Sequence, residues 1–172
     1  MKTLLLAFAL FFGAFSAVYS QSTTKADTPK IYDPTANAQQ DIQRAVAQAQ
    51  KEGKHVLLQL GGNWCVWCLR FHTLTTTDTT LNRILTDNYV VLRVNYSPEN
   101  KNEETLARLG YPQRFGFPVF VVLDEKGNRL HTQNSAYLEE GKGHSPKLVA
   151  DFLQSWSPKA LDPKSYLPKK SK

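Results

Sequence analysis

The sequence of 172 residues is poor in cysteine, and its only two are Cys65 and Cys68. A c-type haem is attached through C-x-x-C followed by histidine, and because residue 69 is leucine this attachment is excluded. A four-ligand zinc site would need histidines to complete it, and only His72 stands close to the cysteines in sequence. A metal site is therefore an alternative without further support, and we expect none.

Long apolar runs are also missing. The run from Leu4 to Phe15, which follows Lys2, is shorter than the roughly 20 residues of a membrane-spanning helix. Together with the small residues after it, this run predicts a signal peptide over residues 1–20 and a mature chain that begins at Gln21. No cysteine stands at the expected cleavage site, so a lipid anchor is not indicated. We expect an exported product without stable membrane insertion, periplasmic in a Gram-negative bacterium and otherwise secreted.

Acidic residues are fewer than basic ones, 15 against 21, and the formal net charge is +6. Several lysines gather with prolines near the end of the chain, which predicts a solvated Lys/Pro-rich tail over residues 158–172. Such a tail is a commoner arrangement than a dedicated site for an acidic partner or a membrane. Nothing further supports nucleic-acid binding, so no such partner is expected.

The chain between its two ends is predicted to form one domain over residues 34–157, preceded by an irregular segment over residues 21–33. The domain should open with a helix that is capped by Asp33, has Pro34 at its first position and ends at Gly53. Its apolar side chains recur at helical spacing, which indicates that one face of this helix is buried.

Further along, short apolar runs alternate with helical patterns in the order α-β-α-β-α-β-β-α. A helix should start near Cys65 and break near Asp78, because three threonines precede this residue and an aspartate can cap a second segment. The remaining predicted elements are buried strands over residues 56–60 and 89–95, which should be parallel, a short helix over 103–109, a hairpin of strands 119–123 and 129–133, and a last helix that opens at Ser145 and buries Leu148, Val149, Phe152, Leu153 and Trp156.

The cysteine pair stands at the junction of the first buried strand with the helix that follows it. At such a junction free backbone N–H groups and the helix dipole stabilise a thiolate on the first sulfur. A structural disulfide usually closes a longer loop, because a short loop removes little entropy from the unfolded chain. The pattern therefore favours redox chemistry at Cys65 and Cys68, with metal binding and an inert disulfide left as alternatives.

Three features together resemble the thioredoxin superfamily: the order of elements, the sequence from Trp64 to Cys68 at a strand-to-helix turn, and Gly116-Phe117-Pro118 before the third strand. The resemblance covers roughly residues 34–157 and is strongest to the exported members. It implies an α/β thioredoxin-like fold, with a central mixed sheet of about four strands flanked by helices.

The resemblance also implies a function, that of an exported thiol–disulfide oxidoreductase working as a reductase or isomerase. Cys65 would attack the disulfide of a protein substrate and Cys68 would resolve the mixed disulfide, so the redox-active disulfide itself is the only expected cofactor. In an oxidising compartment a reductase also needs an electron-donating redox partner. Two alternatives are a metal-binding module that uses Cys65, Cys68 and His72, and a non-catalytic interaction domain.

By the same resemblance Pro118 would be a cis-proline beside the cysteine pair, and Phe117 would offer its backbone and its ring to substrate. A trans proline at the start of an edge strand is the alternative. Trp64 and Trp67 flank the cysteines and could form an apolar docking surface, although buried packing is an equally common role for tryptophan.

The sequence departs from the family's pattern at two places. Gln59 stands where thioredoxins have a buried aspartate that takes the proton of the resolving thiol, and Val66-Trp67 replaces their Gly-Pro dipeptide. His72 lies four residues after Cys68, on the same helix face. It is a candidate proton acceptor or third metal ligand, with an ordinary core histidine as the alternative.

Overall fold

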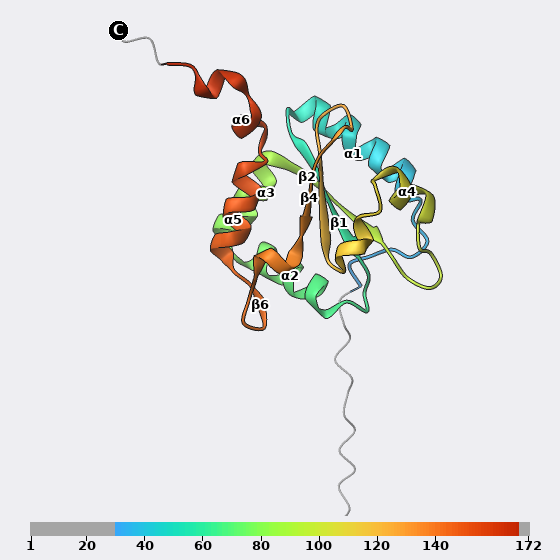
Figure 1. The fold of residues 1–172 in the computed structure, drawn as a ribbon. Coiled ribbons are helices and arrows are strands. Elements are labelled where there is room, and N and C mark those ends of the chain that lie inside the picture. Colours follow the sequence, from blue (N-terminus) through green and yellow to red (C-terminus); the bar gives the residue numbers. More distant parts are fainter. Residues whose placement is uncertain (1–29, 169–172) are drawn as a thin grey trace, which may run out of the picture.

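The structure, a computed structural model, describes residues 30–168 and is drawn in Figure 1. The predicted signal peptide over residues 1–20 lies outside the described residues, as do residues 21–29 of the irregular segment and residues 169–172 of the tail. Within the described range, no helix has the length and apolar character needed to cross a membrane.

A four-stranded mixed sheet with the order β2-β1-β3-β4 forms the centre of the domain. Its strands are β1 His55–Gly61, β2 Tyr89–Asn95, β3 Val119–Leu123 and β4 Arg129–Asn134. β1 is parallel to β2 and antiparallel to β3, and β3 is antiparallel to β4. The predicted mixed sheet is confirmed, including the parallel pair and the hairpin.

Helices cover both faces of this sheet (Figure 1). α1 (Ala38–Glu52) and α4 (Glu103–Arg108) pack on one face, while α2 (Val66–Thr77), α3 (Thr79–Asn88) and α5 (Pro146–Ser155) pack on the other. Side chains of a strand point alternately to the two faces, so Leu58 and Leu60 join the first core and Leu57 the second. Gln59 and Gly61 share the second face with Leu57, and this is the face on which α2 lies.

The break between α2 and α3 confirms the predicted role of Asp78. Its Oδ1 accepts hydrogen bonds from the backbone N–H groups of Thr80 and Leu81, at 2.9 Å each. Its own N–H bonds to the carbonyl of Leu74, so one residue ends α2 and begins α3. α2 is thereby kept short, with the cysteine pair at its start.

Three predicted details of the elements were wrong. α1 begins at Ala38 rather than next to Pro34, because Asp33 closes a turn with the N–H of Thr35 at 2.8 Å and Asn37 caps the helix instead. β2 is only partly buried, since it is an edge strand of the sheet, and Val91 is 37% exposed. Leu148 lies off the buried stripe of α5 and is 40% exposed.

Several short elements were not predicted. They are the 3-10 helices η1 Pro112–Phe115 and η2 Ser135–Leu138, the strand pair β5 Glu139–Glu140 and β6 Gly143–His144, and, within the predicted tail, α6 Pro158–Leu161 and η3 Pro163–Tyr166. The last two are held by local caps, since the Ser157 side chain accepts from the N–H of Ala160 and Asp162 accepts from that of Lys164. Composition alone does not reveal such caps.

Candidate functional site

The two cysteines form a disulfide at the N-terminus of α2. Cys65 is the N-cap of this helix, and its Sγ accepts a hydrogen bond from the backbone N–H of Cys68 at 3.1 Å. Cys65 keeps a small exposed fraction of 4%, whereas Cys68 is fully buried. Because helix N-termini favour negative charge, the sulfur of Cys65 sits where a thiolate is stabilised.

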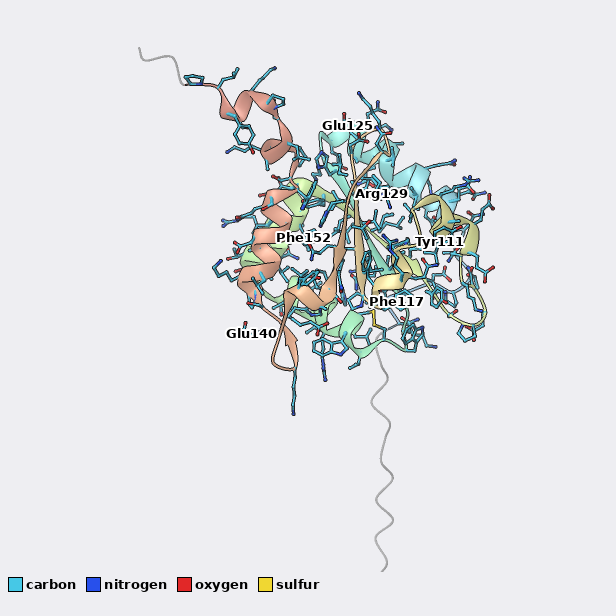
Figure 2. The ribbon with its side chains drawn as sticks, in the orientation of Figure 1. Tyr111, Phe117, Glu125, Arg129, Glu140 and Phe152 are labelled. Carbon is cyan, nitrogen blue, oxygen red and sulfur yellow. A yellow bond between two sulfur atoms is a disulfide. The ribbon has the colours of Figure 1, made fainter. Side chains whose placement is uncertain are left out.

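Pro118 lies at the start of β3, and the peptide bond between Phe117 and Pro118 is cis, as the resemblance implies. Pro118 is buried, and the Phe117 ring packs partly against the cluster of Tyr32, Cys65 and Cys68. Figure 2 labels Phe117 at the end of the sheet where α2 begins. The cis-proline segment and the cysteine pair therefore come together at one end of the domain.

Trp64 is exposed at this end, with 57% of its surface accessible. Its Nε1 donates a hydrogen bond to the carbonyl of Tyr96 at 2.7 Å, and its ring stands edge-on to Phe117, with centroids 5.5 Å apart. Tyr96 packs on the other side of Phe117, at 4.7 Å. Trp64 and Tyr96 also line a hollow of about 530 Å³ together with Ser97, Pro98 and Lys101. This aromatic surface beside Cys65 is named the Trp64 surface below.

Trp67 does not line this hollow, although the two tryptophans are close in sequence. Its ring lies edge-on to His144 at 5.6 Å, and the guanidinium of Arg70 lies 5.2 Å from its centre. Trp67 also packs partly against the cluster of Tyr32, Cys65 and Cys68, and its part in a docking surface stays a prediction. Trp64 precedes the N-cap of α2, whereas Trp67 lies in the first turn of the helix and packs against β6.

Gln59 lies beneath the disulfide and is 2% exposed. Its Nε2 donates a hydrogen bond to the backbone carbonyl of Cys68 at 3.1 Å. The sequence thus identified the residue that faces α2 at the resolving cysteine. An amide at this point fixes the helix backbone, but it cannot take a proton as a carboxylate can.

His72 is held by Arg93 of β2, whose Nη2 donates to His72 Nδ1 at 2.8 Å. Burial and the positive charge of Arg93 both keep the pKa of His72 below its ordinary value of 6.5, burial having the larger effect. Because Nδ1 already accepts a hydrogen bond, the neutral ring carries its proton on Nε2. In this structure the side chain of His72 is therefore hydrogen-bonded to Arg93.

Tyr32 belongs to the segment before α1 and lies against the cysteine pair, only 2% exposed. Asn63 fixes it there, because Asn63 Oδ1 accepts from the backbone N–H groups of Ile31 and Tyr32 at 2.9 and 3.0 Å. Asn63 Nδ2 in turn donates to the carbonyl of Tyr32 at 2.8 Å. Sequence reasoning missed both residues, since Tyr32 stands in an irregular segment without any periodic pattern.

His144 of β6 is a second buried group that the sequence did not reveal. It is 7% exposed and packs edge-on to Phe71 and Trp67, with centroids 5.2 and 5.6 Å away. Burial, and to a smaller degree the charge of Arg70, lower its pKa from 6.5 to about 4. His144 is therefore a neutral ring in the packing of α2 near neutral pH.

Metal-ligating side chains do not gather in the part of the chain that the structure describes. No group of three or more histidine, cysteine, aspartate or glutamate residues there is arranged to hold an ion. The three ligands of the metal-binding alternative do not meet, because His72 is turned to Arg93.

A helix-capping disulfide beside Pro118, on a mixed sheet of this topology, defines a thioredoxin-like fold. The family model described as thioredoxin-like matches residues 37–125. The chain therefore belongs to the thioredoxin-like family.

Relatives named thiol:disulfide interchange protein DsbD are similar over part of their length. The one from Yersinia pestis is 33% identical over 99 residues, which are 58% of this chain and 16% of that protein. The one from Colwellia psychrerythraea is 26% identical over 141 residues, 78% of this chain and 22% of that protein. The chain thus spans about a fifth of the length of these curated relatives.

A solved structure described as a disulphide isomerase from Xylella fastidiosa Temecula1 has a similar fold. The TM-score is 0.64, and the match covers 74% of this chain and 96% of that one at 21% sequence identity. At this identity the likeness supports the fold, which confirms the predicted fold class.

Proposed function

We propose that the protein is an exported thiol–disulfide oxidoreductase that exchanges disulfides with protein substrates through Cys65 and Cys68. The observation that carries the proposal is the disulfide at the start of α2, in which the sulfur of Cys65 accepts the backbone N–H of Cys68. The same N–H would stabilise the thiolate of Cys65 after reduction. The names of the DsbD relatives, which refer to thiol:disulfide interchange, support the same chemistry.

The reaction has two steps, in which the electrons pass from the cysteine pair to the substrate. The thiolate of Cys65 attacks one sulfur of a substrate disulfide, a mixed disulfide forms, and the other substrate sulfur leaves with the bonding electrons and takes up a proton. The thiolate of Cys68 then attacks the sulfur of Cys65, and the second substrate sulfur leaves as a thiol. The substrate disulfide is reduced, and the Cys65–Cys68 disulfide is formed.

We propose that this chemistry runs as reduction or isomerisation. In an oxidising compartment the cysteine pair must then be returned to its dithiol form by an electron-donating partner, itself a dithiol. Export is proposed from the signal peptide that the sequence predicts over residues 1–20. The Val66-Trp67 dipeptide distinguishes this pair from that of thioredoxin.

The Trp64 surface is the proposed docking site for the substrate segment around its disulfide. Trp64 is exposed and directly precedes Cys65 in the sequence. The ring of Phe117 contacts Trp64 edge-on and also packs against the cluster that contains both cysteines. Exposed aromatic side chains of this kind are enriched where proteins bind one another. Trp67 and His72 are proposed to serve the packing of α2 rather than substrate contact.

Reduction of insulin by dithiothreitol tests the proposal. The wild-type protein should accelerate precipitation of the insulin B chain, and Cys65→Ser should abolish the acceleration. Cys68→Ser should also lose turnover, but it should accumulate a mixed disulfide through Cys65 that mass spectrometry detects. Failure of the folded wild-type protein to accelerate insulin reduction, together with absence of the adduct in Cys68→Ser, would favour the interaction-domain alternative instead.

A further inference from the structure

We infer that the hydroxyl of Tyr32 donates a hydrogen bond to the sulfur of Cys68 when the disulfide is reduced, and thereby stabilises the thiolate that resolves the mixed disulfide. The inference deepens the proposed function and rests on it, because a thiolate at Cys68 matters only if this residue attacks the sulfur of Cys65. It assigns to a tyrosine before α1 a hydrogen bond that Gln59 does not make, because the Nε2 of Gln59 donates to the backbone carbonyl of Cys68.

Close approach of the two side chains is visible at Gly61, the last residue of β1. A Cβ built on Gly61 would collide with the Sγ of Cys68 and would lie 2.9 Å from the hydroxyl oxygen of Tyr32. Both groups therefore lie against the same small patch of backbone, and the absence of a side chain at Gly61 lets both approach it. Tyr32, Cys65 and Cys68 form one buried cluster.

The hydroxyl of Tyr32 is buried and has no hydrogen-bond partner among residues 30–168. Buried tyrosine hydroxyls usually find one. Tyr89 is the matched example in this chain, since it is 3% exposed and donates to the carbonyl of Leu153 at 2.6 Å. An unpartnered donor next to a sulfur that gains negative charge upon reduction is satisfied in the reduced protein and not in the disulfide form.

The hydroxyl keeps its proton over the physiological range, so it can donate to a thiolate. Burial raises the pKa of Tyr32 far above its ordinary value of 10.0, and this outweighs the charge of Arg93 and the Gln59 side chain, which both lower it. Tyr32 therefore keeps its proton and differs in kind from a buried carboxylate, which would accept the proton of Cys68. Stabilising the thiolate by donation lowers the pKa of a thiol, as hydrogen bonds to a charged form do.

The charged and titratable groups on the elements around Cys68 also favour a thiolate at this residue. Besides Tyr32 they are Arg93 on β2, His72 on α2 and His144 on β6. Arg93 is cationic and lies opposite Gln59 in the sheet, with its Nε buried and without a partner among the described residues. Positive charge on this side of the disulfide favours a thiolate in the same direction as the Tyr32 hydroxyl.

The proton balance of the resolving step follows from these roles. In the mixed disulfide Cys68 is a thiol, and its proton leaves to solvent, which can approach Gln59 and Arg93 from a surface hollow of about 430 Å³. The thiolate then forms the bond to Cys65, and the substrate sulfur leaves with the electron pair of the bond that breaks. Tyr32 keeps its proton throughout, and it donates a hydrogen bond to Cys68 while this sulfur carries the negative charge.

The test is a titration of Cys68 in a Cys65→Ser background, followed by the ultraviolet absorbance of the thiolate. Tyr32→Phe keeps the ring and removes the donor, and it should raise the pKa of Cys68 by about one unit, as expected for a hydrogen bond to a charged group. Tyr89→Phe is the matched control, since it also removes a buried hydroxyl, and it should leave that pKa unchanged.

Two further measurements extend the test, and the first of them does not depend on the folding of Tyr32→Phe. Replacing Tyr32 by a fluorotyrosine, whose hydroxyl is a stronger donor, should lower the pKa of Cys68. With the cysteine pair intact, Tyr32→Phe should slow resolution of a preformed mixed disulfide about tenfold at a pH below the pKa of Cys68, with less effect above it.

An unchanged pKa of Cys68 in folded Tyr32→Phe would overturn the inference, and so would an equal change in Tyr89→Phe. A lowered pKa would overturn it too, because Tyr32 would then be acting as an acceptor. The titration uses no substrate, so its outcome is separate from that of the insulin assay, which tests the proposed function.

Discussion

The two sides of the disulfide differ in a way that reverses the usual distribution of polarity in a protein. On the outer side, exposed apolar residues Trp64 and Val66 surround Cys65, at 57% and 51% exposure. On the inner side, buried polar groups of Tyr32 and Gln59 surround Cys68. Exposed apolar surface is suited to a partner, and buried polar groups are suited to charge on a sulfur. The comparison separates substrate binding from sulfur chemistry.

The largest expected difference between the two sides concerns the reduced sulfurs. At mildly acidic pH Cys65 should react with iodoacetamide roughly 100-fold faster than Cys68, because Cys65 is accessible and its thiolate accepts a helix N–H. A short pulse of reagent followed by peptide mass spectrometry measures both rates. The denatured protein is the control and should show similar rates, whereas similar rates in the folded protein would refute the assignment of attacking and resolving cysteine.

Gly61 tests how tightly the inner side is packed. Gly61→Ala should lower the free energy of unfolding by about 1–3 kcal/mol, the usual range for overpacking, because its Cβ would meet Cys68 and Tyr32. Gly143→Ala is the control, since a Cβ there has no atom within 4 Å. Urea unfolding compares the two, and an equal effect of both changes would show that the inner side has room.

Trp64 tests the outer side. Trp64→Ala should raise KM for a protein disulfide about tenfold with little change in kcat, because the aromatic ring contributes to binding and not to the sulfur chemistry. A small disulfide such as oxidised glutathione should be reduced as before. Tyr137→Ala removes another exposed aromatic ring, at 75% exposure on η2, and should leave both substrates unaffected. A lower kcat with an unchanged KM would contradict this and would show that Trp64 contributes to the chemical step.

The smallest effect is expected at His144, where α2 meets β6. Its pKa is about 4 in the folded protein against 6.5 ordinarily, so the unfolded chain binds the proton first as the pH falls. The free energy of unfolding should therefore decrease from about pH 6.5 to about pH 4, by about 1 kcal/mol after allowance for solvent screening. His144→Phe should remove this part of the pH dependence. Above about pH 6.5 its free energy of unfolding should change with pH as that of the wild type does. Unfolding at several pH values checks it, and an unchanged acid slope would assign the effect to other groups.

Local patterns were sufficient to predict the strands, the break at Asp78 and the position of the cysteines at the start of a helix, whereas the mixed sheet of about four strands came from the family resemblance. Each of these depends on neighbours in sequence, such as an apolar run, a capping side chain or a strand-to-helix junction. The inner side of the disulfide depends instead on contacts across the chain. Asn63 binds the backbone of Tyr32 over a separation of 31 residues, and nothing in either segment indicates the pairing.

The site residues show the same division. Gln59 could be placed beneath Cys68 because a strand position fixes its face, and His72 could be placed on the right helix for the same reason. The contact of His72 with Arg93 could not be predicted, because it depends on how α2 lies against the edge strand β2. Helical periodicity shows which residues share a face, but it does not show what lies opposite.

The side chain of Asn63 has a consequence for how substitutions combine. It makes three hydrogen bonds to the backbone of Ile31 and Tyr32, two of them to Tyr32, and it stands two residues before Cys65 in the sequence. Energies of residues that share one network do not add, so the effect of changing Tyr32 depends on which residue occupies position 63. In a lineage of related chains the two positions are therefore expected to change together, and a replacement tolerated at one of them narrows what the other can accept.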